Sequence, residues 1–170
     1  MDVDNMILIG MPGSGKSTVG VILAKVLGYG FIDSDLVIQE KEGRLLPEIM
    51  EEEGIDGFIQ IENRVNSSLA AKHSVIATGG SVVYGREAME HLGRIGKIIY
   101  LKLPYEELTT RLGNLKCQGV VHRDGQTLKE LYEERVPLYE KYADFTVDEN
   151  GLGVEETLEQ IVKLLGEEEA

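Results

Sequence analysis

Apolar residues in this chain alternate between short continuous runs and wider, helical spacings. Runs at residues 6–9, 30–32, 75–77, 97–101 and 145–147 have the length of buried strands. Between them, apolar residues recur every three or four positions, most clearly over 19–27, 58–69 and 154–165. Strands that alternate with helical segments are typical of βαβ units with parallel strands. The pattern therefore predicts an α/β protein with a mostly parallel sheet.

Local signals refine the expected helices. Gly28 is placed to end the first helix, and the spacing of Thr127 and Glu130 matches a capping box that opens a later one. A short helix is expected over 106–112. The first helix is expected to bury an apolar stripe formed by Val19, Ile22, Leu23, Val26 and Leu27.

Composition narrows the class of protein. A length of 170 residues predicts one domain with a sizeable core. The net charge of −13 argues against nucleic acid and against an anionic membrane surface as partners. No apolar run is long enough to cross a bilayer and no signal-peptide pattern opens the chain, so we expect a cytoplasmic protein. The lone Cys117 forms no internal disulfide, and we expect a monomer.

Residues 10–17 carry the pattern G-x-x-x-x-G-K-[ST] between a predicted strand and a predicted helix. Small residues let backbone N–H groups surround phosphates, and the following helix start favours negative charge. In such loops the lysine contacts the β- and γ-phosphates and the hydroxyl binds Mg²⁺. The sequence therefore predicts ATP and Mg²⁺ as ligands, rather than a glycine-rich turn alone. The nucleotide-binding residues are Gly13, Ser14, Gly15, Lys16, Ser17 and Thr18.

Two carboxylates, Asp33 and Asp35, follow the second predicted strand. They would project the same way if the strand extends that far. One could hold Mg²⁺ while the other accepts a proton from the hydroxyl that is phosphorylated. The alternative is a helix N-cap formed by Asp33, Ser34 or Asp35. The spacing alone leaves open which of the two carboxylates joins Ser17 at the metal and which accepts the proton.

Four further residues are candidate ligands. Gly79 and Gly80 follow the third strand, where bare backbone could approach a substrate or simply form a turn. Arg135 falls on the apolar stripe of the helix that Thr127 opens. A buried guanidinium needs an anionic ligand or an ion pair, and Glu62, on the apolar face of another helix, is the candidate partner. Arg111 lies on the short helix over 106–112, where a solvent-facing charge is the simpler interpretation.

Taken in order, these residues resemble the shikimate kinase family over nearly the whole chain. The matching stretches are residues 10–17, 31–35, 77–80, 98–101, Arg111, 134–139 and 142–144. The resemblance implies a P-loop kinase with three α/β/α layers, a five-stranded parallel sheet and a mobile lid. It places the acceptor-binding region at about 34–72 and the lid at about 114–126. The implied reaction is ATP-dependent phosphorylation of shikimate to shikimate 3-phosphate.

The resemblance also implies roles for individual residues. Lys16, Asp35 and Arg111 would be catalytic, and Arg111 would also lie near the nucleotide. Asp35, Gly79, Gly80 and Arg135 would bind the acceptor, with Arg135 at its carboxylate. Asp33 would assist the metal.

The chain departs from the family pattern at positions that touch substrate. Ile59 stands where a second carboxylate-binding arginine is expected, and Gln118 and Gly119 replace an Arg-Pro pair of the lid. Ser81 replaces a third glycine. Loss of an arginine removes a charge-assisted hydrogen bond and suggests a less anionic acceptor. Two alternatives therefore stay open: a related kinase for another hydroxyl acceptor, and a nucleotide-binding regulatory module without turnover.

Overall fold

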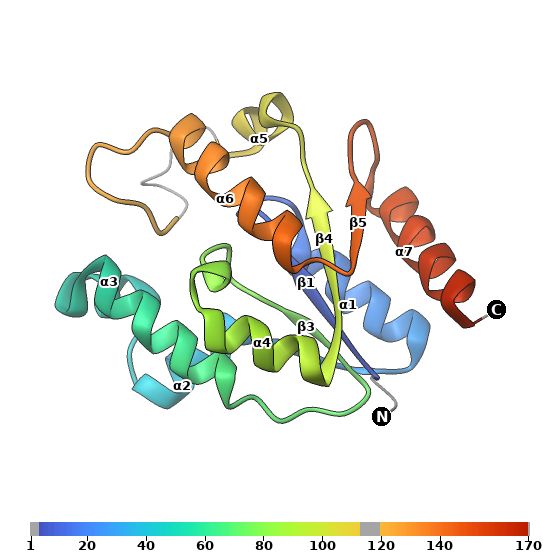
Figure 1. Ribbon diagram of the computed structural model, residues 1–170, viewed down its shortest axis with the longest axis horizontal. Coiled ribbons are helices and arrows are strands. Elements are labelled where there is room, and N and C mark those ends of the chain that lie inside the picture. The colour runs from blue at the N-terminus through green and yellow to red at the C-terminus, as the bar shows by residue number, and fades with distance from the viewer. Residues whose placement is uncertain (1–3, 113–119, 170) are drawn as a thin grey trace.

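The computed structural model describes residues 4–112 and 120–169 (Figure 1). Five parallel strands form one sheet in the order β2-β3-β1-β4-β5. The strands are β1 (Asn5–Ile9), β2 (Gly30–Asp33), β3 (Ser74–Ala77), β4 (Gly96–Lys102) and β5 (Phe145–Asp148). The helices are α1 (Lys16–Leu27), α2 (Ser34–Glu42), α3 (Leu46–Ser67), α4 (Arg86–Ile95), α5 (Tyr105–Leu112), α6 (Leu128–Tyr142) and α7 (Val154–Glu169), with a 3₁₀ turn, η1 (Val82–Tyr84).

The sheet forms the middle of three layers (Figure 1). Helices α1 and α7 cover one face, where Leu8, Leu23 and Ile161 are buried together. The other face is covered by α4, α6 and the C-terminal part of α3, around Ile7 and Tyr100. Because each central strand is buried on both faces, it appears in the sequence as a continuous apolar run. No described helix combines the length and the apolar composition that crossing a bilayer requires.

The strand order determines where on the sheet a ligand site is expected. Strand β1 leads through α1 to β2 on one side of the sheet, whereas β3 leads through α4 to β4 on the other. Neighbouring strands β1 and β3 therefore send their connections in opposite directions, and ligands of open α/β sheets bind at such a switch point. The loop of residues 10–15 follows β1, and Gly79 and Gly80 follow β3. The two loops meet at the carboxyl edge of the sheet.

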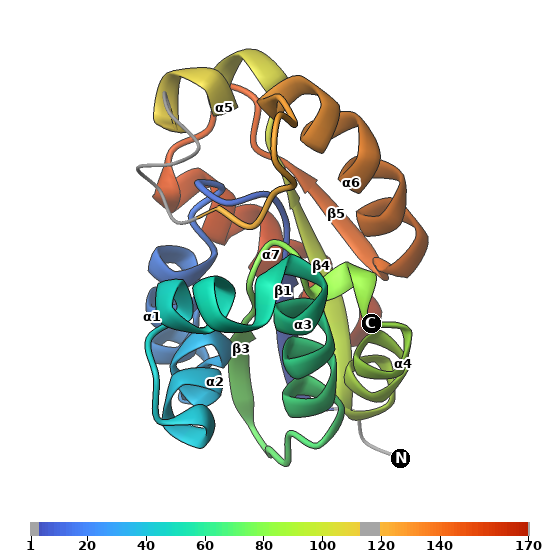
Figure 2. The ribbon, with the colours of Figure 1, turned by 90° about the vertical axis from the view of Figure 1, so that its left-hand side faces the viewer.

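A smaller apolar cluster lies beside the main core. It joins α2 to α3 through Ile38, Ile49 and Phe58, and Val121 packs on it from the segment that precedes α6. Helix α3 bends at Gly54, whose φ of 72° and ψ of 177° are not helical. Figure 2 shows the two parts of α3 at a steep angle to each other. The second part carries Phe58 and Glu62 toward the carboxyl edge of the sheet.

The five strands predicted from the apolar pattern are confirmed to within about one residue. The predicted helices are all present, but α3 begins at Leu46 and α7 ends at Glu169, well outside the ranges that the apolar stripes indicate. The expected stripe on α1 is partly wrong. Ile22 and Val26 are 37% and 60% exposed. Helix α1 instead packs through Val19, Gly20, Leu23 and Ala24, because the small residues allow a closer approach to the sheet.

This close approach makes a fold-level prediction. A Cβ at Gly20 would lie 2.8 Å from Cε2 of Phe31, so Gly20→Ala should overpack the α1–sheet contact and lower the free energy of unfolding by about 1–3 kcal/mol. Gly166 lies in α7 with nothing within 4 Å of its Cβ position, so Gly166→Ala should raise the unfolding free energy by up to about 1 kcal/mol. Urea unfolding of both variants checks this. A stabilising Gly20→Ala would contradict it.

Candidate active site

The loop between β1 and α1 surrounds a lysine ammonium group. Nζ of Lys16 donates hydrogen bonds to the carbonyl oxygens of Gly10 at 2.8 Å and Met11 at 2.9 Å, and it lies 3.5 Å from Oγ of Ser14. Burial lowers the pKa of Lys16 to about 8, while the negative charge of Asp35 opposes that shift. A buried cation that faces a cavity is a strong site for phosphate oxygens.

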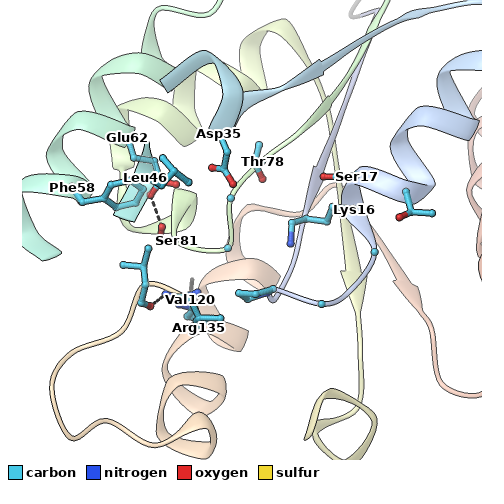
Figure 3. Close-up of a pocket in the computed structure, with 17 residues that line it drawn as sticks. Lys16, Ser17, Asp35, Leu46, Phe58, Glu62, Thr78, Ser81, Val120 and Arg135 are labelled. Atoms are coloured by element: carbon cyan, nitrogen blue, oxygen red, sulfur yellow. Dashed lines mark hydrogen bonds between the residues drawn. The ribbon is translucent and has the colours of Figure 1, made fainter. Parts of the chain in front are cut away.

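The cavity beside this loop has a volume of about 340 Å³ (Figure 3). Its wall is formed by the P-loop, the start of α2, one face of α3, the turn after β3, and α6. It is lined by Pro12, Gly13, Gly15, Lys16, Ser17, Thr18, Asp35, Leu46, Phe58, Glu62, Thr78, Gly79, Gly80, Ser81, Val120, Val121 and Arg135. Most of the expected site residues are therefore brought together. Ser14 is buried in the loop instead of lining the cavity.

Asp33 combines both interpretations made from the sequence. Strand β2 ends at this residue, and its Oδ1 accepts a hydrogen bond from the N–H of Asp35 at 2.9 Å, which caps α2. Its Oδ2 lies 3.4 Å from Oγ of Ser17 and accepts a hydrogen bond from it. The strand does not extend as far as Asp35, which already belongs to the first turn of α2, so the two carboxylates do not project from one strand.

The Ser17 hydroxyl and the Asp33 carboxylate are oxygen ligands of the kind that Mg²⁺ prefers. Within residues 4–112 and 120–169, no group of three or more His, Cys, Asp or Glu side chains could hold a metal ion. Mg²⁺ commonly binds through one or two protein oxygens together with substrate phosphates. The pair fits that arrangement.

The Asp35 carboxyl faces the cavity from the N-terminal turn of α2 (Figure 3). Burial and the nearby Asp33 raise its pKa to about 6, and Lys16 opposes the shift. A carboxyl group with a pKa near neutrality is ionised at pH 7 and is still basic enough to accept a proton. Its location and acidity suit proton transfer from a hydroxyl bound in the cavity.

The absence of side chains at Gly79 and Gly80 lets four groups of the cavity wall lie close to the backbone after β3. A Cβ at Gly79 would lie 2.8 Å from Oδ1 of Asp35 and 2.9 Å from Oε2 of Glu62. A Cβ at Gly80 would lie 2.7 Å from Cδ of Pro12 and 2.9 Å from Nη1 of Arg135. Any side chain at either position would therefore displace a group that lines the cavity. These glycines form a close approach rather than an ordinary turn.

Arg135 points inward from α6 and is 1% exposed. Its Nε donates to the Tyr84 hydroxyl at 3.3 Å, its Nη2 donates to the carbonyl of Val121, and its guanidinium lies 5.4 Å from the centre of the Tyr84 ring. The alternative of an ion pair with Glu62 is wrong for the residues that the structure describes, since Arg135 makes no salt bridge there. Nη1 of Arg135 is buried and lacks a hydrogen-bond partner in the same residues.

The sequence suggests Glu62 only as a partner for an arginine, whereas in the structure it lines the cavity itself. Its Oε1 accepts a 2.6 Å hydrogen bond from Oγ of Ser81, and its Oε2 has no partner within the described chain. Burial raises the pKa of Glu62 to about 7. The signal in the sequence was an acidic residue on the apolar stripe of a helix. Whether such a residue pairs with an arginine or lines a cavity depends on which elements face that helix.

Arg111 lies beside the phosphate loop, outside the main cavity. Its Nη1 donates to the carbonyl of Gly13 at 2.9 Å, and its Nη2 is 3.8 Å from Glu107. The side chain is 38% exposed. Arg111 therefore contacts the loop from the outer side, on α5, and it is not merely a charge in solvent.

The departures from the family pattern fall in different places. Ile59 is half-buried and lines a separate small hollow with Tyr84 and Arg123 instead of the main cavity. Ser81 holds Glu62 through its hydroxyl. Gln118 and Gly119, and the first part of the expected lid, lie outside the described residues. Val120 and Val121, which follow them, line the main cavity.

The sheet order, the loop around Lys16 and the polar cavity beside it define a P-loop α/β kinase. The profile of the shikimate kinase family matches residues 12–166, and this chain belongs to that family. The shikimate kinase of Synechococcus sp. (strain RCC307) is 42% identical over 166 residues, covering 95% of this chain and 84% of the relative. That of Thermodesulfovibrio yellowstonii is 39% identical over 162 residues, covering 94% and 93%.

Solved structures agree. A shikimate kinase from Acinetobacter baumannii in complex with shikimate superposes with a TM-score of 0.86 at 33% identity, covering 98% of this chain and 95% of that one. The shikimate kinase of Aquifex aeolicus superposes with a TM-score of 0.80 at 32% identity, covering 95% and 96%. The expected family and fold are confirmed.

The buried Glu62 makes a stability prediction. Its pKa rises from the ordinary 4.5 to about 7 in the fold, so the protonated form is favoured there. Its stabilising contribution is complete below pH 4.5 and is lost as the pH rises through about 7. Relative to the wild type, Glu62→Gln should therefore gain up to about 3 kcal/mol of unfolding free energy between pH 4.5 and pH 8.

Urea unfolding at a series of pH values measures that gain. Glu90→Gln is a matched control because Glu90 is about half exposed on α4, away from the cavity. A stability difference between wild type and Glu62→Gln that does not change with pH would contradict the prediction.

Proposed function

We propose that this chain transfers the γ-phosphate of ATP to the 3-hydroxyl of shikimate, giving shikimate 3-phosphate and ADP. Its family membership and its likeness to a relative whose structure contains shikimate support the proposal. The observation that carries it is geometric. Lys16, Asp35 and Arg135 reach one cavity from the P-loop, α2 and α6, so phosphate, hydroxyl and carboxylate can be bound side by side.

On the phosphate side, backbone N–H groups of residues 13–18 and the Lys16 ammonium would bind the β- and γ-phosphates. Arg111 would lie near the nucleotide and contribute positive charge from α5. The bond from the acceptor oxygen to the γ-phosphorus forms while the bond from that phosphorus to the bridging oxygen breaks, and ADP leaves. Lys16 stabilises the negative charge that develops during this transfer.

On the acceptor side, the Asp35 carboxylate would orient the attacking hydroxyl and accept its proton. Nη1 of Arg135, which has no hydrogen-bond partner among the described residues, would donate to the acceptor carboxylate, since a buried guanidinium nitrogen without a partner is best satisfied by an anion. The backbone at Gly79 and Gly80 would lie directly against the acceptor.

Ser17 and Asp33 would hold Mg²⁺, and the ion, when bound, would neutralise charge on the β- and γ-phosphates. Residues 34–72 would form the acceptor-binding region and residues 114–126 the lid of one P-loop kinase domain. Phe58, Glu62, Val120 and Val121 line the cavity from these two segments, which supports that division. Because one copy supplies every group that the reaction uses, we propose a monomer, acting in the cytoplasm where ATP is available.

A related kinase for a different hydroxyl acceptor is the second candidate. Among the described residues, the acceptor side of the cavity is lined by one cation, Arg135, and by two carboxyl groups, those of Asp35 and Glu62. A site with one cation and two carboxyl groups attracts an anionic acceptor less strongly than a site with two arginines would. Coupled ADP release with shikimate and a panel of other hydroxy acids separates the two candidates. Nucleotide binding without ADP release for any acceptor would favour a regulatory module.

Lys16→Ala tests the phosphate side. It removes the buried ammonium group, so kcat/KM for shikimate should fall by about 10²-fold or more. Calorimetry with a non-hydrolysable ATP analogue should show weakened binding. Lys25→Ala, an exposed position on the same helix, should leave both values unchanged. Equal affinity and activity of Lys16→Ala and the wild type would refute this assignment.

Asp35→Asn tests the proton acceptor. The amide keeps the shape of the side chain but cannot accept a proton from the hydroxyl, so kcat should fall by about 10²–10⁴-fold while nucleotide affinity is retained. Steady-state assays with calorimetry on the same preparation measure both. Retention of most of the wild-type kcat would show that another group receives the proton.

A further inference from the structure

Two nitrogens of the Arg135 guanidinium are bonded within the protein, and the third is left for a ligand. Nε donates to the hydroxyl oxygen of Tyr84 at 3.3 Å, and Nη2 donates to the carbonyl oxygen of Val121. Nη1 is buried, has no hydrogen-bond partner among the described residues, and lies 2.9 Å from where a Cβ on Gly80 would be. The contacts of Nε and Nη2 therefore determine where Nη1 is presented in the cavity.

Tyr84 contacts this guanidinium with both parts of its side chain. Its hydroxyl accepts the hydrogen bond from Nε, and its ring centre lies 5.4 Å from the guanidinium carbon, within the range of a cation–π interaction. Tyr84 is the last residue of η1, the turn that follows Gly80 and Ser81. It lines the small hollow beside the main cavity and not the main cavity itself, so its connection to the acceptor side is Arg135.

The Tyr84 hydroxyl is itself fixed in direction. It donates to Oε1 of Glu134 at 3.0 Å, so its proton points away from Arg135 and its lone pairs are available to Nε. A hydroxyl that donates to a carboxylate is a stronger acceptor than an isolated one. Burial raises the pKa of Tyr84, so the hydroxyl keeps its proton at neutral pH. Another tyrosine beside Arg135, Tyr139, donates its hydroxyl to the carbonyl oxygen of Gly80 at 2.6 Å, which leaves Tyr84 as the support of Nε.

A neutral support leaves the charge of Arg135 available. A carboxylate paired with the guanidinium would fix it but would also compete with an anionic ligand. A tyrosine hydroxyl and a peptide carbonyl fix the same group without cancelling its charge. An arginine that is held before the ligand arrives also loses less conformational entropy on binding. The contacts of Arg135 therefore suit an anion-binding group whose orientation is set in advance.

We propose that Tyr84 is a positioning residue, whose ring and hydroxyl hold the Arg135 guanidinium so that Nη1 donates to a carboxylate on the acceptor. Tyr84 thereby determines how strongly the site prefers a carboxylate over a neutral group at that position of the acceptor. This inference rests on the proposed function in that the acceptor occupies this cavity with its carboxylate at Arg135.

The test measures kcat/KM for shikimate and for its primary amide, in which a neutral group of similar shape replaces the carboxylate. Tyr84→Phe keeps the ring and removes the hydroxyl, which leaves Nε of a buried guanidinium without its partner. The ratio of kcat/KM for shikimate to that for the amide should fall by about 10-fold, through a higher KM for shikimate, with kcat and KM for ATP within about twofold of the wild type. Tyr84→Ala also removes the ring and should lower the ratio further.

Tyr132→Phe is the matched control. Tyr132 is also half-buried, but its hydroxyl donates to the carbonyl oxygen of Leu103 at 3.1 Å and the residue does not line the cavity. Its removal should leave the ratio at the wild-type value. Thermal unfolding establishes that each variant is folded. A proportional loss of kcat/KM with both acceptors in Tyr84→Phe would overturn the proposal and leave Tyr84 as a structural residue.

A double-mutant cycle shows whether Tyr84 acts through Arg135. Arg135→Met removes the guanidinium while keeping an unbranched side chain, so most of the preference for the carboxylate should disappear. In that background, Tyr84→Phe should change the ratio no further, because no Nε–H remains for the hydroxyl to accept. A further fall of the same size in the double variant would contradict the proposal.

Calorimetric binding of shikimate and its amide separates this inference from the proposed function. If the wild type releases no ADP yet binds shikimate more tightly than the amide, and Tyr84→Phe reduces that difference, the proposed function fails and the role of Tyr84 stands. If shikimate is phosphorylated and the preference is unchanged in Tyr84→Phe, the reverse holds. Equal affinity of the wild type for shikimate and the amide would overturn the inference, whether or not ADP is released.

Discussion

The site depends on the absence of side chains at Gly79 and Gly80. The P-loop, α2, α3 and α6 all bring atoms to within 3 Å of where a Cβ would lie on one of these residues. Because β1 and β3 are neighbours with oppositely directed connections, the fold forces the two loops together at this edge. A side chain at either glycine would separate the phosphate side of the cavity from its acceptor side. Bare backbone keeps Lys16, Asp35, Glu62 and Arg135 around one volume.

The cavity contains two buried cations, although the protein as a whole is acidic. The chain carries a net charge of −13, yet the cavity's two buried cations are held by neutral groups among the described residues. Lys16 bonds to loop carbonyls, and Arg135 bonds to a tyrosine hydroxyl and a carbonyl. Both therefore keep their attraction for anionic ligands. The two cavity carboxyls, by contrast, have pKa values raised by burial toward neutrality. Two cations that are held by neutral groups, next to carboxyl groups with raised pKa values, suit phosphoryl transfer to a hydroxyl.

Sequence patterns predicted what depends on short stretches of chain. The strands, the P-loop and the Thr127 cap follow from neighbouring residues, and the structure agrees with them. The buried face of α1 did not follow, because Gly20 and Ala24 pack more closely than the larger Ile22 and Val26. The partners of Arg135 and Glu62 were also beyond the sequence. Both lie on apolar stripes, but whether they meet depends on how α3 and α6 are placed over the sheet, which no local pattern encodes.

The two sides of the cavity constrain the sequence differently. On the phosphate side, the backbone of the P-loop would bind the phosphates of ATP, which all ATP-dependent kinases use. The binding chemistry of this side therefore follows from the loop sequence itself. The acceptor side is built from single side chains on separate helices, where one substitution alters charge without disturbing the fold. Ser81, which holds Glu62, lines that side, whereas Ile59 lies in a neighbouring hollow. Membership of the family therefore defines the fold and the phosphate donor more tightly than it defines the acceptor. In this chain, the charged side chains that line the cavity opposite the P-loop are Asp35, Glu62 and Arg135.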